Sequence, residues 1–355
     1  MSSLRPVAGP PASVVEALAA WLEAPAEPEP LIVETSGSTG RPKRVVLSRR
    51  AVRASGEATA EVLGARGQWL LALPATYVAG VQVVARSLAA GHRPVLLDDH
   101  PGFVEAAAAM TPGVPHLVSL VPTQLFRLLD DPAATAALQR FHTVLLGGGP
   151  IDPGLRVRAG AAGVRVVATY GSAETAGGCV YDGWPLPGVR LRLEDDGRVA
   201  IAGPTLFDGY DGDPALTAEV LVDGWFRTSD AGRLLPDGRL ELLGRVDDLV
   251  VSGGVNVPTP VVARRLRAHP GVAAAEVLGV EDPEWGRRVV AWVVPAGGAG
   301  ASAGGPAPDL EGLRDWVAAE HPRAWAPRQV VLLDAVPLLP NGKTDRLALR
   351  GMVEG

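Results

Sequence analysis

The sequence predicts an α/β fold, in which a large N-terminal layered α/β domain carries a small β-rich subdomain and precedes a small, mobile C-terminal α+β domain. Between residues 31 and 171, short continuous runs of Val and Leu alternate with helical stretches, which is typical of strands buried on both faces. Between residues 189 and 244, Gly-Asp and Asp-Gly turns separate strand-like runs. A chain of 355 residues fits about two domains. We predict an N-terminal domain over 1–246 and a C-terminal domain over 247–355.

The elements of the N-terminal domain follow from this rhythm. Ser48 is a typical N-cap residue, so a helix is predicted from there to residue 63, and a second helix over 79–90. The strands share a short length and a Val- and Leu-rich composition. They are predicted over 31–34, 45–47, 68–73, 93–98, 116–121, 142–149 and 164–171.

The C-terminal domain has a mixed pattern. Its Gly-, Ala- and Pro-rich run at 295–309 has low complexity and predicts a flexible loop. Around this loop, apolar periodicity predicts two helices and three strands. The helices span 260–268 and 310–320, and the strands span 274–280, 287–294 and 329–333.

Composition excludes several classes of protein. The net charge of −6 offers no field for nucleic acid, and a single Cys179 excludes a disulfide framework and a thiolate zinc site. Six scattered histidines lack the spacing of a zinc or Ser-His site. No secretory signal is recognisable, and the most apolar stretch, 69–90, is interrupted by Pro74, Gln82 and Arg86. We therefore expect a cytoplasmic protein without a membrane span and without a nucleic-acid partner.

The two lysines are the first candidate site residues. Among 33 basic residues only Lys43 and Lys343 are lysines, as expected where a GC-rich coding bias turns most lysines into arginines. A solvated surface cation tolerates that exchange, whereas a compact ammonium fitted against one phosphate oxygen does not. Chance survival of both residues is the alternative.

A hydroxyl- and glycine-rich segment lies between two predicted strands and ends at Lys43. Its glycines allow backbone N–H groups to approach a ligand, its hydroxyls donate hydrogen bonds and the lysine adds charge, which together suit a polyphosphate. It does not match a Walker A loop, and a Ser/Gly-rich hairpin turn is the alternative. The candidate residues are Thr35, Ser36, Gly37, Ser38, Thr39, Gly40 and Lys43.

This TSGSTGRPK segment resembles the phosphate loop of the AMP-forming acyl/aryl-CoA synthetase superfamily, the adenylate-forming ligases. Further signatures follow in the order of that family, and both lysines fall within them. They cover nearly the whole chain. The matching segments are Tyr170–Glu174, Gly203–Tyr210, Thr228–Asp230, Gly244–Asp248, Ser252–Asn256 and Pro340–Lys343.

The resemblance implies a first half-reaction in which a carboxylate attacks the α-phosphorus of ATP and expels pyrophosphate. It implies that Lys343 bridges the carboxylate and the α-phosphate, and that Glu174 binds Mg²⁺. Asp230 would accept the ribose hydroxyls, and Arg245 would contact the ribose or phosphate. A helix-terminal acid, an ordinary turn aspartate and an exposed tail lysine are the alternatives for Glu174, Asp230 and Lys343.

The resemblance also implies a second half-reaction, in which CoA displaces AMP. Asp247 corresponds to the hinge about which the C-terminal domain swings. Ser252, Gly253 and Gly254 correspond to the loop that lines the CoA tunnel. The remaining residues expected to contact ATP or AMP are Gly148, Gly149, Tyr170, Gly171 and Ser172.

Three positions depart from the family pattern. Ala173 replaces a threonine, so one phosphate-binding hydroxyl is missing, and Ser172 or Thr175 is expected to compensate. Ser229 replaces a glycine and requires a backbone conformation that accepts a Cβ. Tyr77 takes the place of a histidine or aromatic residue that gates the acid pocket in many members. None of these changes removes a charge that the chemistry needs.

The phosphate loop begins as early as residue 35, and this compactness resembles the short o-succinylbenzoate–CoA ligases of menaquinone biosynthesis. Such an aromatic acid carries a second carboxylate, for which Arg86 is the candidate partner; a surface or helix-capping role is the alternative. A ligase acting on another acid or loading a carrier protein, and an inactive nucleotide-binding relative, also remain open. A P-loop kinase would need a Walker A loop. The expected partners are therefore the acid, ATP, Mg²⁺ and CoA, with a homo-oligomer left open.

Overall fold

The computed structural model describes residues 4–35, 42–149, 151–246, 249–296, 309–337 and 344–353. The chain divides into two compact units. The first consists of Met1–Arg192, Ala200–Thr228 and Leu234–Leu240, and the second of Leu193–Val199, Ser229–Arg233 and Glu241–Gly355. The predicted boundary between residues 246 and 247 involves Asp247, which lies outside the described residues.

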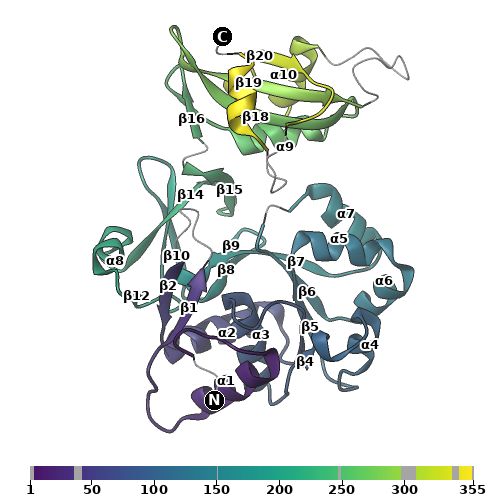
Figure 1. The fold of residues 1–355 in the computed structure, drawn as a ribbon, viewed down its shortest axis with the longest axis vertical. Coiled ribbons are helices and arrows are strands. Elements are labelled where there is room, and N and C mark those ends of the chain that lie inside the picture. The colour runs from purple at the N-terminus through teal and green to yellow at the C-terminus, as the bar shows by residue number, and fades with distance from the viewer. Residues whose placement is uncertain are drawn as a thin grey trace. The chain divides into compact units, whose positions relative to one another are not determined.

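A seven-stranded sheet forms the centre of the first unit (Figure 1). Its strand order is β4-β3-β5-β6-β7-β8-β9, and the pairs from β4 to β7 are parallel. β3 and β6 are buried along their whole length, as their continuous apolar runs predict. The strands are β3 (Gln68–Leu71), β4 (Val95–Leu96), β5 (His116–Leu120), β6 (Thr143–Leu146), β7 (Val166–Ser172), β8 (Gly177–Tyr181) and β9 (Trp184–Pro185).

Helices cover both faces of this sheet, which confirms the layered α/β prediction (Figure 1). One layer contains α1 (Pro11–Glu23), α2 (Arg49–Leu63) and α3 (Val78–Ala89). The predicted cap is present, because the Ser48 side chain accepts a hydrogen bond from the Ala51 amide. The opposite layer contains α4 (Phe103–Ala108), α5 (Pro122–Asp130), α6 (Pro132–Leu138) and α7 (Pro153–Ala161).

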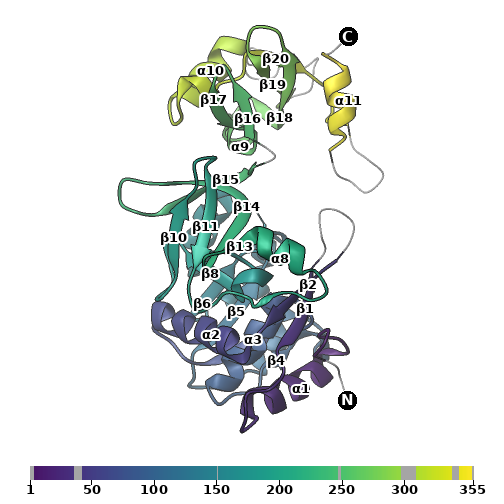
Figure 2. The same cartoon turned by 90° about the vertical axis from the view of Figure 1, so that its left-hand side faces the viewer.

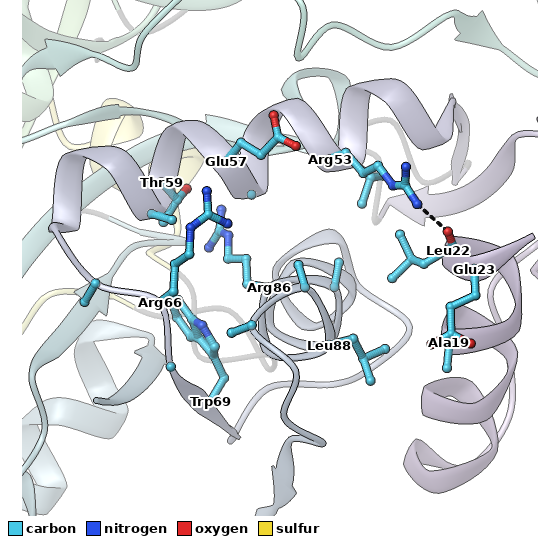
Figure 3. Close-up of a pocket in the computed structure, with 18 residues that line it drawn as sticks. Ala19, Leu22, Glu23, Arg53, Glu57, Thr59, Arg66, Trp69, Arg86 and Leu88 are labelled. Carbon is cyan, nitrogen blue, oxygen red and sulfur yellow. Dashed lines mark hydrogen bonds between the residues drawn. The ribbon is translucent and has the colours of Figure 1, made fainter. Parts of the chain in front are cut away.

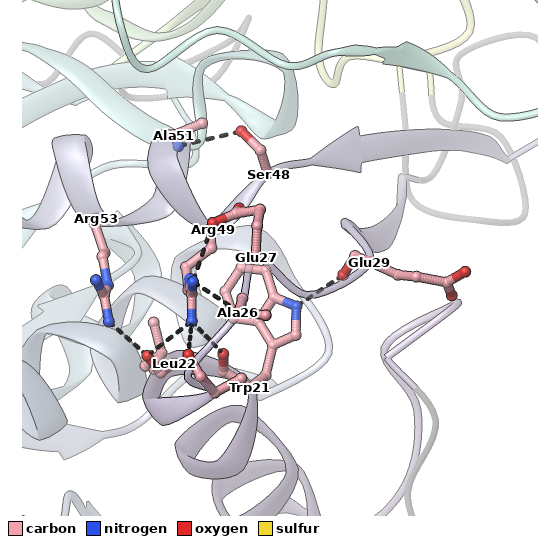
Figure 4. Close-up of polar contacts among 10 residues, drawn as sticks. Trp21, Leu22, Ala26, Glu27, Glu29, Ser48, Arg49, Ala51 and Arg53 are labelled. Carbon is pink, nitrogen blue, oxygen red and sulfur yellow. Dashed lines mark hydrogen bonds and ion pairs between the residues drawn. The ribbon is translucent and has the colours of Figure 1, made fainter.

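Two arginines of α2, the buried Arg49 and the exposed Arg53, attach α1 to the rest of its layer (Figure 4). Arg49 donates hydrogen bonds to the Ala24 carbonyl at 2.5 Å and the Ala26 carbonyl at 3.0 Å. Arg53 donates to the Leu22 carbonyl at 2.5 Å. The last carbonyls of a helix lack partners within the helix, and these guanidinium groups supply them.

A small antiparallel sheet of order β1-β2-β12 carries the candidate phosphate loop. β1 (Leu31–Thr35) and β2 (Lys43–Leu47) pair so that Thr35 lies opposite Lys43. β12 (Gly209–Tyr210) pairs with β2 on its other side, with Tyr210 opposite Val45. The sheet thus joins two segments that are far apart in the sequence.

A five-stranded sheet occupies the Gly-Asp-rich part of the chain, as predicted. Its order is β10-β11-β14-β13, and β15 also pairs with β14. The division into units assigns some of its residues to each unit. Its elements are β10 (Arg190–Leu193), β11 (Arg198–Ala202), β13 (Leu221–Val222), β14 (Trp225–Leu234) and β15 (Leu240–Arg245), with helix α8 (Pro214–Val220) preceding β13.

The second unit contains a three-stranded sheet packed against helices (Figure 2). β18 (Val272–Asp282) pairs antiparallel with β19 (Gly286–Pro295), which pairs parallel with β20 (Gln329–Leu332). The predicted helices and strands of this region are all present. The remaining elements are β16 (Leu249–Ser252), β17 (Val255–Pro258), α9 (Thr259–Arg267), α10 (Leu310–Ala318) and α11 (Arg346–Gly351). In the parts of the chain that the structure describes, no helix has the length and apolar character needed to cross a membrane.

Candidate functional site

A cavity of about 140 Å³ lies at the carboxyl ends of the parallel strands. The chain leaves β3 for β4 on one side and returns to β5 on the other, so β3 and β5 flank a switch point in strand order. Open α/β sheets bind ligands at such a point. The cavity is lined by Leu73 after β3, by Ser119, Leu120 and Val121 at the end of β5, by Gly147 and Gly148 after β6, and by Thr169 and Gly171 of β7.

Glycines bring the backbone close to this cavity. A Cβ on Gly147 would lie 2.3 Å from Thr169 Oγ1, and one on Gly171 would lie 2.1 Å from the Gly177 carbonyl oxygen. Gly148 lines the cavity with a φ of +77°, which a side chain would strain. Gly149 is not part of the lining and has open space around it. Of the predicted Gly148–Gly149 pair, only Gly148 therefore adjoins the cavity.

Two polar side chains of α3, those of Gln82 and Arg86, line the cavity. Gln82 is 1% exposed and donates a hydrogen bond to the Val52 carbonyl, while its Oε1 has no partner among the described residues. Arg86 is 8% exposed, and its Nη2 lies 3.4 Å from Ser55 Oγ. The Arg86 Nε is buried without a hydrogen-bond partner in the described part of the chain. The alternative of an Arg86 at the surface is therefore wrong.

Tyr77 is not brought to the cavity. It precedes α3, and its side chain is 57% exposed. Its neighbours Val78 and Ala79 contribute to the lining instead. The Tyr77 side chain therefore does not line the cavity, although the sequence predicts that it gates the acid pocket.

A second group of candidate residues forms a cluster beside the small sheet. Glu174 lies in the short 3₁₀ turn Ala173–Thr175 after β7, and the residue is 8% exposed. Its Oε1 accepts a hydrogen bond of 2.8 Å from the hydroxyl of Tyr210 in β12. Lys43 Nζ lies 5.2 Å from the centroid of the Tyr210 ring, within the range of a cation–π contact. Lys43 and Glu174 are thus linked through Tyr210.

Tyr210 is a site residue that no motif in the sequence marks. It is the last residue of the Gly203–Tyr210 segment, and its 36-residue separation from Glu174 hides the contact in the sequence. Burial and the neighbouring Glu174 carboxylate raise the pKa of Tyr210 above its ordinary value, since both disfavour the phenolate. The phenol therefore stays protonated and donates to Glu174.

Only Thr35 and Lys43 of the phosphate-loop candidates can be placed. They form the last cross-strand pair of the antiparallel strands β1 and β2. The predicted contacts Ser36, Gly37, Ser38, Thr39 and Gly40 lie outside the described residues.

The structure distinguishes the two hydroxyls expected to compensate for Ala173. Thr175 Oγ1 accepts a hydrogen bond from the Ser172 amide at 2.9 Å and donates to the Gly177 carbonyl at 2.7 Å. The buried Ser172 hydroxyl has no partner among the described residues. Thr175 therefore holds the turn together, whereas the buried hydroxyl of Ser172 is left without a hydrogen-bond partner among the described residues.

We expect Ser172→Ala to lower the reaction rate without changing stability, and Thr175→Ala to lower stability. Ser172→Ala should leave the melting temperature unchanged and slow pyrophosphate release about tenfold, the cost of about one hydrogen bond. Thr175→Ala leaves buried backbone groups unpaired and should lower the free energy of unfolding by about 1–3 kcal/mol. Thermal unfolding and pyrophosphate release, measured on both variants, check this; a destabilised Ser172→Ala would contradict it.

The two residues predicted to bind the ribose, Asp230 and Arg245, contact each other within the second unit. Asp230 in β14 forms an ion pair with Arg245, the last residue of β15, at an Nε–Oδ1 distance of 3.7 Å. Ser229 lies in the extended backbone of β14, where any side chain is tolerated, so its replacement of a glycine requires no strain. Both side chains remain partly exposed and accessible to a ligand.

Gly253 and Gly254 form the turn between β16 and β17, and Ser252 is the last residue of β16, paired with Val255. Gly253 and Gly254 have φ values of +56° and +77°, as a two-residue hairpin of the favoured type requires. A Cβ on Gly253 would lie 2.6 Å from the ring of Trp285. The Ser252 hydroxyl is buried and has no hydrogen-bond partner in the described ranges. The turn is thus fixed in shape by its glycines.

The remaining predicted residues are placed as follows. Tyr170 and Gly171 lie in β7, next to the cavity at the carboxyl ends of the sheet. Lys343 and Asp247 lie outside the described residues. Cys179 is fully buried, and burial raises its pKa to about 12, so the thiol is not a nucleophile at neutral pH.

Comparison with known proteins identifies the family. Residues 20–211 match the AMP-binding enzyme family, and residues 262–343 match the AMP-binding enzyme C-terminal domain. The chain is 44% identical over 326 residues to a probable 2-succinylbenzoate–CoA ligase of Mycobacterium tuberculosis, covering 90% of this chain and 83% of that protein. It is 39% identical over 276 residues to the 2-succinylbenzoate–CoA ligase of Salmonella typhimurium, covering 75% of this chain and 58% of that protein.

A solved structure agrees with the sequence match. The o-succinylbenzoate CoA synthetase (MenE) from Bacillus subtilis, in complex with the acyl-adenylate intermediate OSB-AMP, superimposes with a TM-score of 0.70. It is 27% identical, and the match covers 90% of this chain and 68% of that one. The family match over most of the N-terminal part, together with the relative at 44% identity, shows that this chain belongs to the AMP-binding enzyme family, the adenylate-forming ligases.

Proposed function

We propose that the protein is an o-succinylbenzoate–CoA ligase of menaquinone biosynthesis. The acid is activated by ATP to an acyl-adenylate with release of pyrophosphate, and CoA then displaces AMP to form the thioester. The similarity to the mycobacterial relative, 44% identity over 90% of the chain, carries this proposal. The buried Arg86 beside the cavity supports it, because the substrate has a second carboxylate that needs a cationic partner.

The chemistry of the first step explains why cations matter. A carboxylate and a triphosphate repel each other, so the protein must supply positive charge and fix the reacting atoms in line. Lys43 is anchored at the end of the hairpin by its strand pairing and its contact with Tyr210. We assign it to the phosphates, and we assign Lys343 to the reacting carboxylate and α-phosphate. Asp230, oriented by Arg245, would hold the ribose.

The surroundings of Glu174 fit a bound Mg²⁺. Its carboxylate is buried, accepts one hydrogen bond from Tyr210, and forms no ion pair with a basic side chain among the described residues. A buried carboxylate without a cation is unfavourable. Mg²⁺ in proteins commonly takes one or two carboxylates together with water and phosphate oxygens. When bound, it would neutralise charge on the phosphates, while Tyr210 keeps the Glu174 carboxylate in place.

We expect Asp247→Pro to separate the two half-reactions. If Asp247 is the hinge, proline fixes its φ near −65° and prevents the C-terminal domain from reaching the position for thioester formation. Pyrophosphate release in a single turnover should stay within about threefold of the wild type, whereas CoA thioester formation should fall about 100-fold or more. Rapid-quench measurement of both products checks this. Equal loss of both steps would argue against the hinge.

The function is tested by supplying a panel of acids with ATP and Mg²⁺ and measuring pyrophosphate release. The panel contains o-succinylbenzoate, benzoate and hexanoate. We expect o-succinylbenzoate to exceed benzoate in kcat/KM by about 100-fold or more, since benzoate lacks the second carboxylate and the chain that joins it to the reacting one. Faster release with benzoate or hexanoate would keep the family and overturn the substrate.

A further inference from the structure

A second cavity, of about 320 Å³, is enclosed by helices α1, α2 and α3 and by the segment that leads into β3 (Figure 3). This volume is at the lower end of the range for ligand pockets, so the cavity suits a compact molecule. Its lining is mixed, because it combines apolar side chains with charged ones. The apolar part includes Leu22, Val52, Trp69 and Leu88.

Two arginines of this lining have no acidic partner. Arg86 of α3 is buried, its Nε has no hydrogen-bond partner among the described residues, and its hydrogen bond to Ser55 Oγ, at 3.4 Å, is long. Arg66 precedes β3 and is exposed, and it forms no hydrogen bond, ion pair or ring contact with any residue that the structure describes. Figure 3 shows both guanidinium groups turned toward the same part of the cavity. Two cations that face one space without a carboxylate favour an anion there.

Trp69 places an aromatic surface beside these charges. Its side chain is buried, and the guanidinium carbon of Arg86 lies 5.4 Å from the centroid of its ring. Trp69 lines the second cavity and not the smaller one, so in this arrangement the Arg86 charge adjoins the second cavity. An indole ring next to two guanidinium groups suits a ligand that joins an aromatic ring to an anionic group.

The charges around the cavity limit the charge of its ligand. The lining carries three arginines, Arg53, Arg66 and Arg86, and two glutamates, Glu23 and Glu57. One positive charge is therefore in excess, and a single carboxylate balances it. Both glutamates are exposed, so they would repel a polyphosphate that approaches from solvent. These charges favour a small aromatic monocarboxylate.

We propose that the second cavity is a regulatory site for a small aromatic monocarboxylate, which raises the KM for the acid substrate by holding Arg86 over Trp69. Within the described residues, Arg86 is the one residue that belongs to both cavity linings. An anion that pairs with Arg86 from the second cavity withdraws its charge from the acid, although the two ligands occupy different spaces. This effect on KM rests on the proposed function, whereas binding to the second cavity does not.

Calorimetric titration with 2-naphthoate tests the site directly. The wild type should bind 2-naphthoate about tenfold or more tightly than the neutral 2-naphthamide, because only the carboxylate forms a charged pair with arginine. Arg66→Ala should raise the Kd for 2-naphthoate about tenfold or more. Arg50→Ala is the matched control, because Arg50 is exposed on α2 and belongs to neither lining. Its Kd should equal that of the wild type.

Pyrophosphate release with o-succinylbenzoate then separates regulation from competition for the acid pocket. An effector in a second site raises KM only to a plateau, because the coupling between two sites is finite, whereas a competitor raises KM without limit. We expect a plateau at about five- to tenfold in the wild type and in Arg50→Ala. Ala89→Phe should show no rise relative to its own KM without 2-naphthoate, because Ala89 lines the second cavity alone and the added ring fills part of it.

The proposal is overturned if the wild type binds neither compound, if Arg66→Ala binds 2-naphthoate as tightly as the wild type, or if KM rises without limit. Should Arg66→Ala not unfold cooperatively, Arg66→Gln gives the same comparison, because it also removes the charge. A wild type inactive on o-succinylbenzoate would refute the proposed function instead. The calorimetric comparison of Arg66→Ala with Arg50→Ala would then still decide whether the second cavity binds the carboxylate.

Discussion

Lys343→Ala should lower the rate of pyrophosphate release by about 1000-fold or more while leaving ATP binding nearly unchanged. A cation that bridges the attacking carboxylate and the α-phosphate acts mainly in the transition state, where the charge of both reactants is concentrated, and such groups in phosphoryl transfer contribute about this much. The loss should therefore appear in the single-turnover rate, and the dissociation constant for ATP should stay within about threefold. Rapid-quench and equilibrium binding measurements check the two parts separately.

Lys343→Arg, compared with Lys343→Ala, tests whether the site needs the shape of lysine as well as its charge. In a chain whose other basic residues apart from Lys43 are all arginines, retention of lysine here indicates a requirement for its compact ammonium group. We expect the arginine variant to lose about 100-fold, well beyond the effect of a conservative surface change. Normal pyrophosphate release in either variant would remove Lys343 from the chemical step.

Glu174→Gln should produce the second large effect, a loss of about 100-fold in pyrophosphate release at limiting Mg²⁺. Glutamine keeps the shape of the side chain and can still accept the hydrogen bond from Tyr210, so the change removes one charge. If that charge holds Mg²⁺, the Mg²⁺ concentration needed for half-maximal rate should rise about tenfold or more. Titration of the rate with Mg²⁺ at fixed ATP measures this.

Tyr210→Phe is the matched control for Glu174→Gln. It keeps the carboxylate and the ring beneath Lys43 and removes the hydrogen bond to Oε1. We expect a smaller loss, of about tenfold. Because the pKa of Tyr210 is raised above its ordinary value, the phenol keeps its proton at mildly alkaline pH, so its titration should not reduce the rate there. An unchanged Mg²⁺ dependence in Glu174→Gln would contradict the metal assignment.

The fold was predictable because its signals are local. Continuous apolar runs predict the buried parallel strands β3, β5 and β6, and Ser48 predicts the start of α2. The predicted strand ends were less accurate. The strand expected over 68–73 ends at Leu71, ahead of Pro74, and the strand expected over 93–98 is reduced to Val95–Leu96, followed by a 3₁₀ turn. At the edge of a sheet, pairing on one side alone decides the length of a strand.

The site was predictable only where a motif marks it. The sequence indicates Glu174, but Tyr210 reaches it only through the pairing of β12 with β2. Arg86 is in the last turn of an amphipathic helix, a position equally compatible with solvent, and its burial depends on how α2 and α3 pack. The hydrogen bonds of Thr175, and the Ser172 hydroxyl without a partner in the described ranges, likewise follow from a turn that composition does not reveal.

The most direct test of the account is the stoichiometry of one turnover with o-succinylbenzoate. Enzyme in excess over ATP is mixed with the acid and Mg²⁺, and CoA is added after a delay. We expect about one equivalent of pyrophosphate per ATP before CoA is added. AMP and the CoA thioester should form only after its addition, because the acyl-adenylate stays bound in the site until then. Pyrophosphate release that requires no acid, or AMP release that precedes CoA at the same rate, would contradict the account.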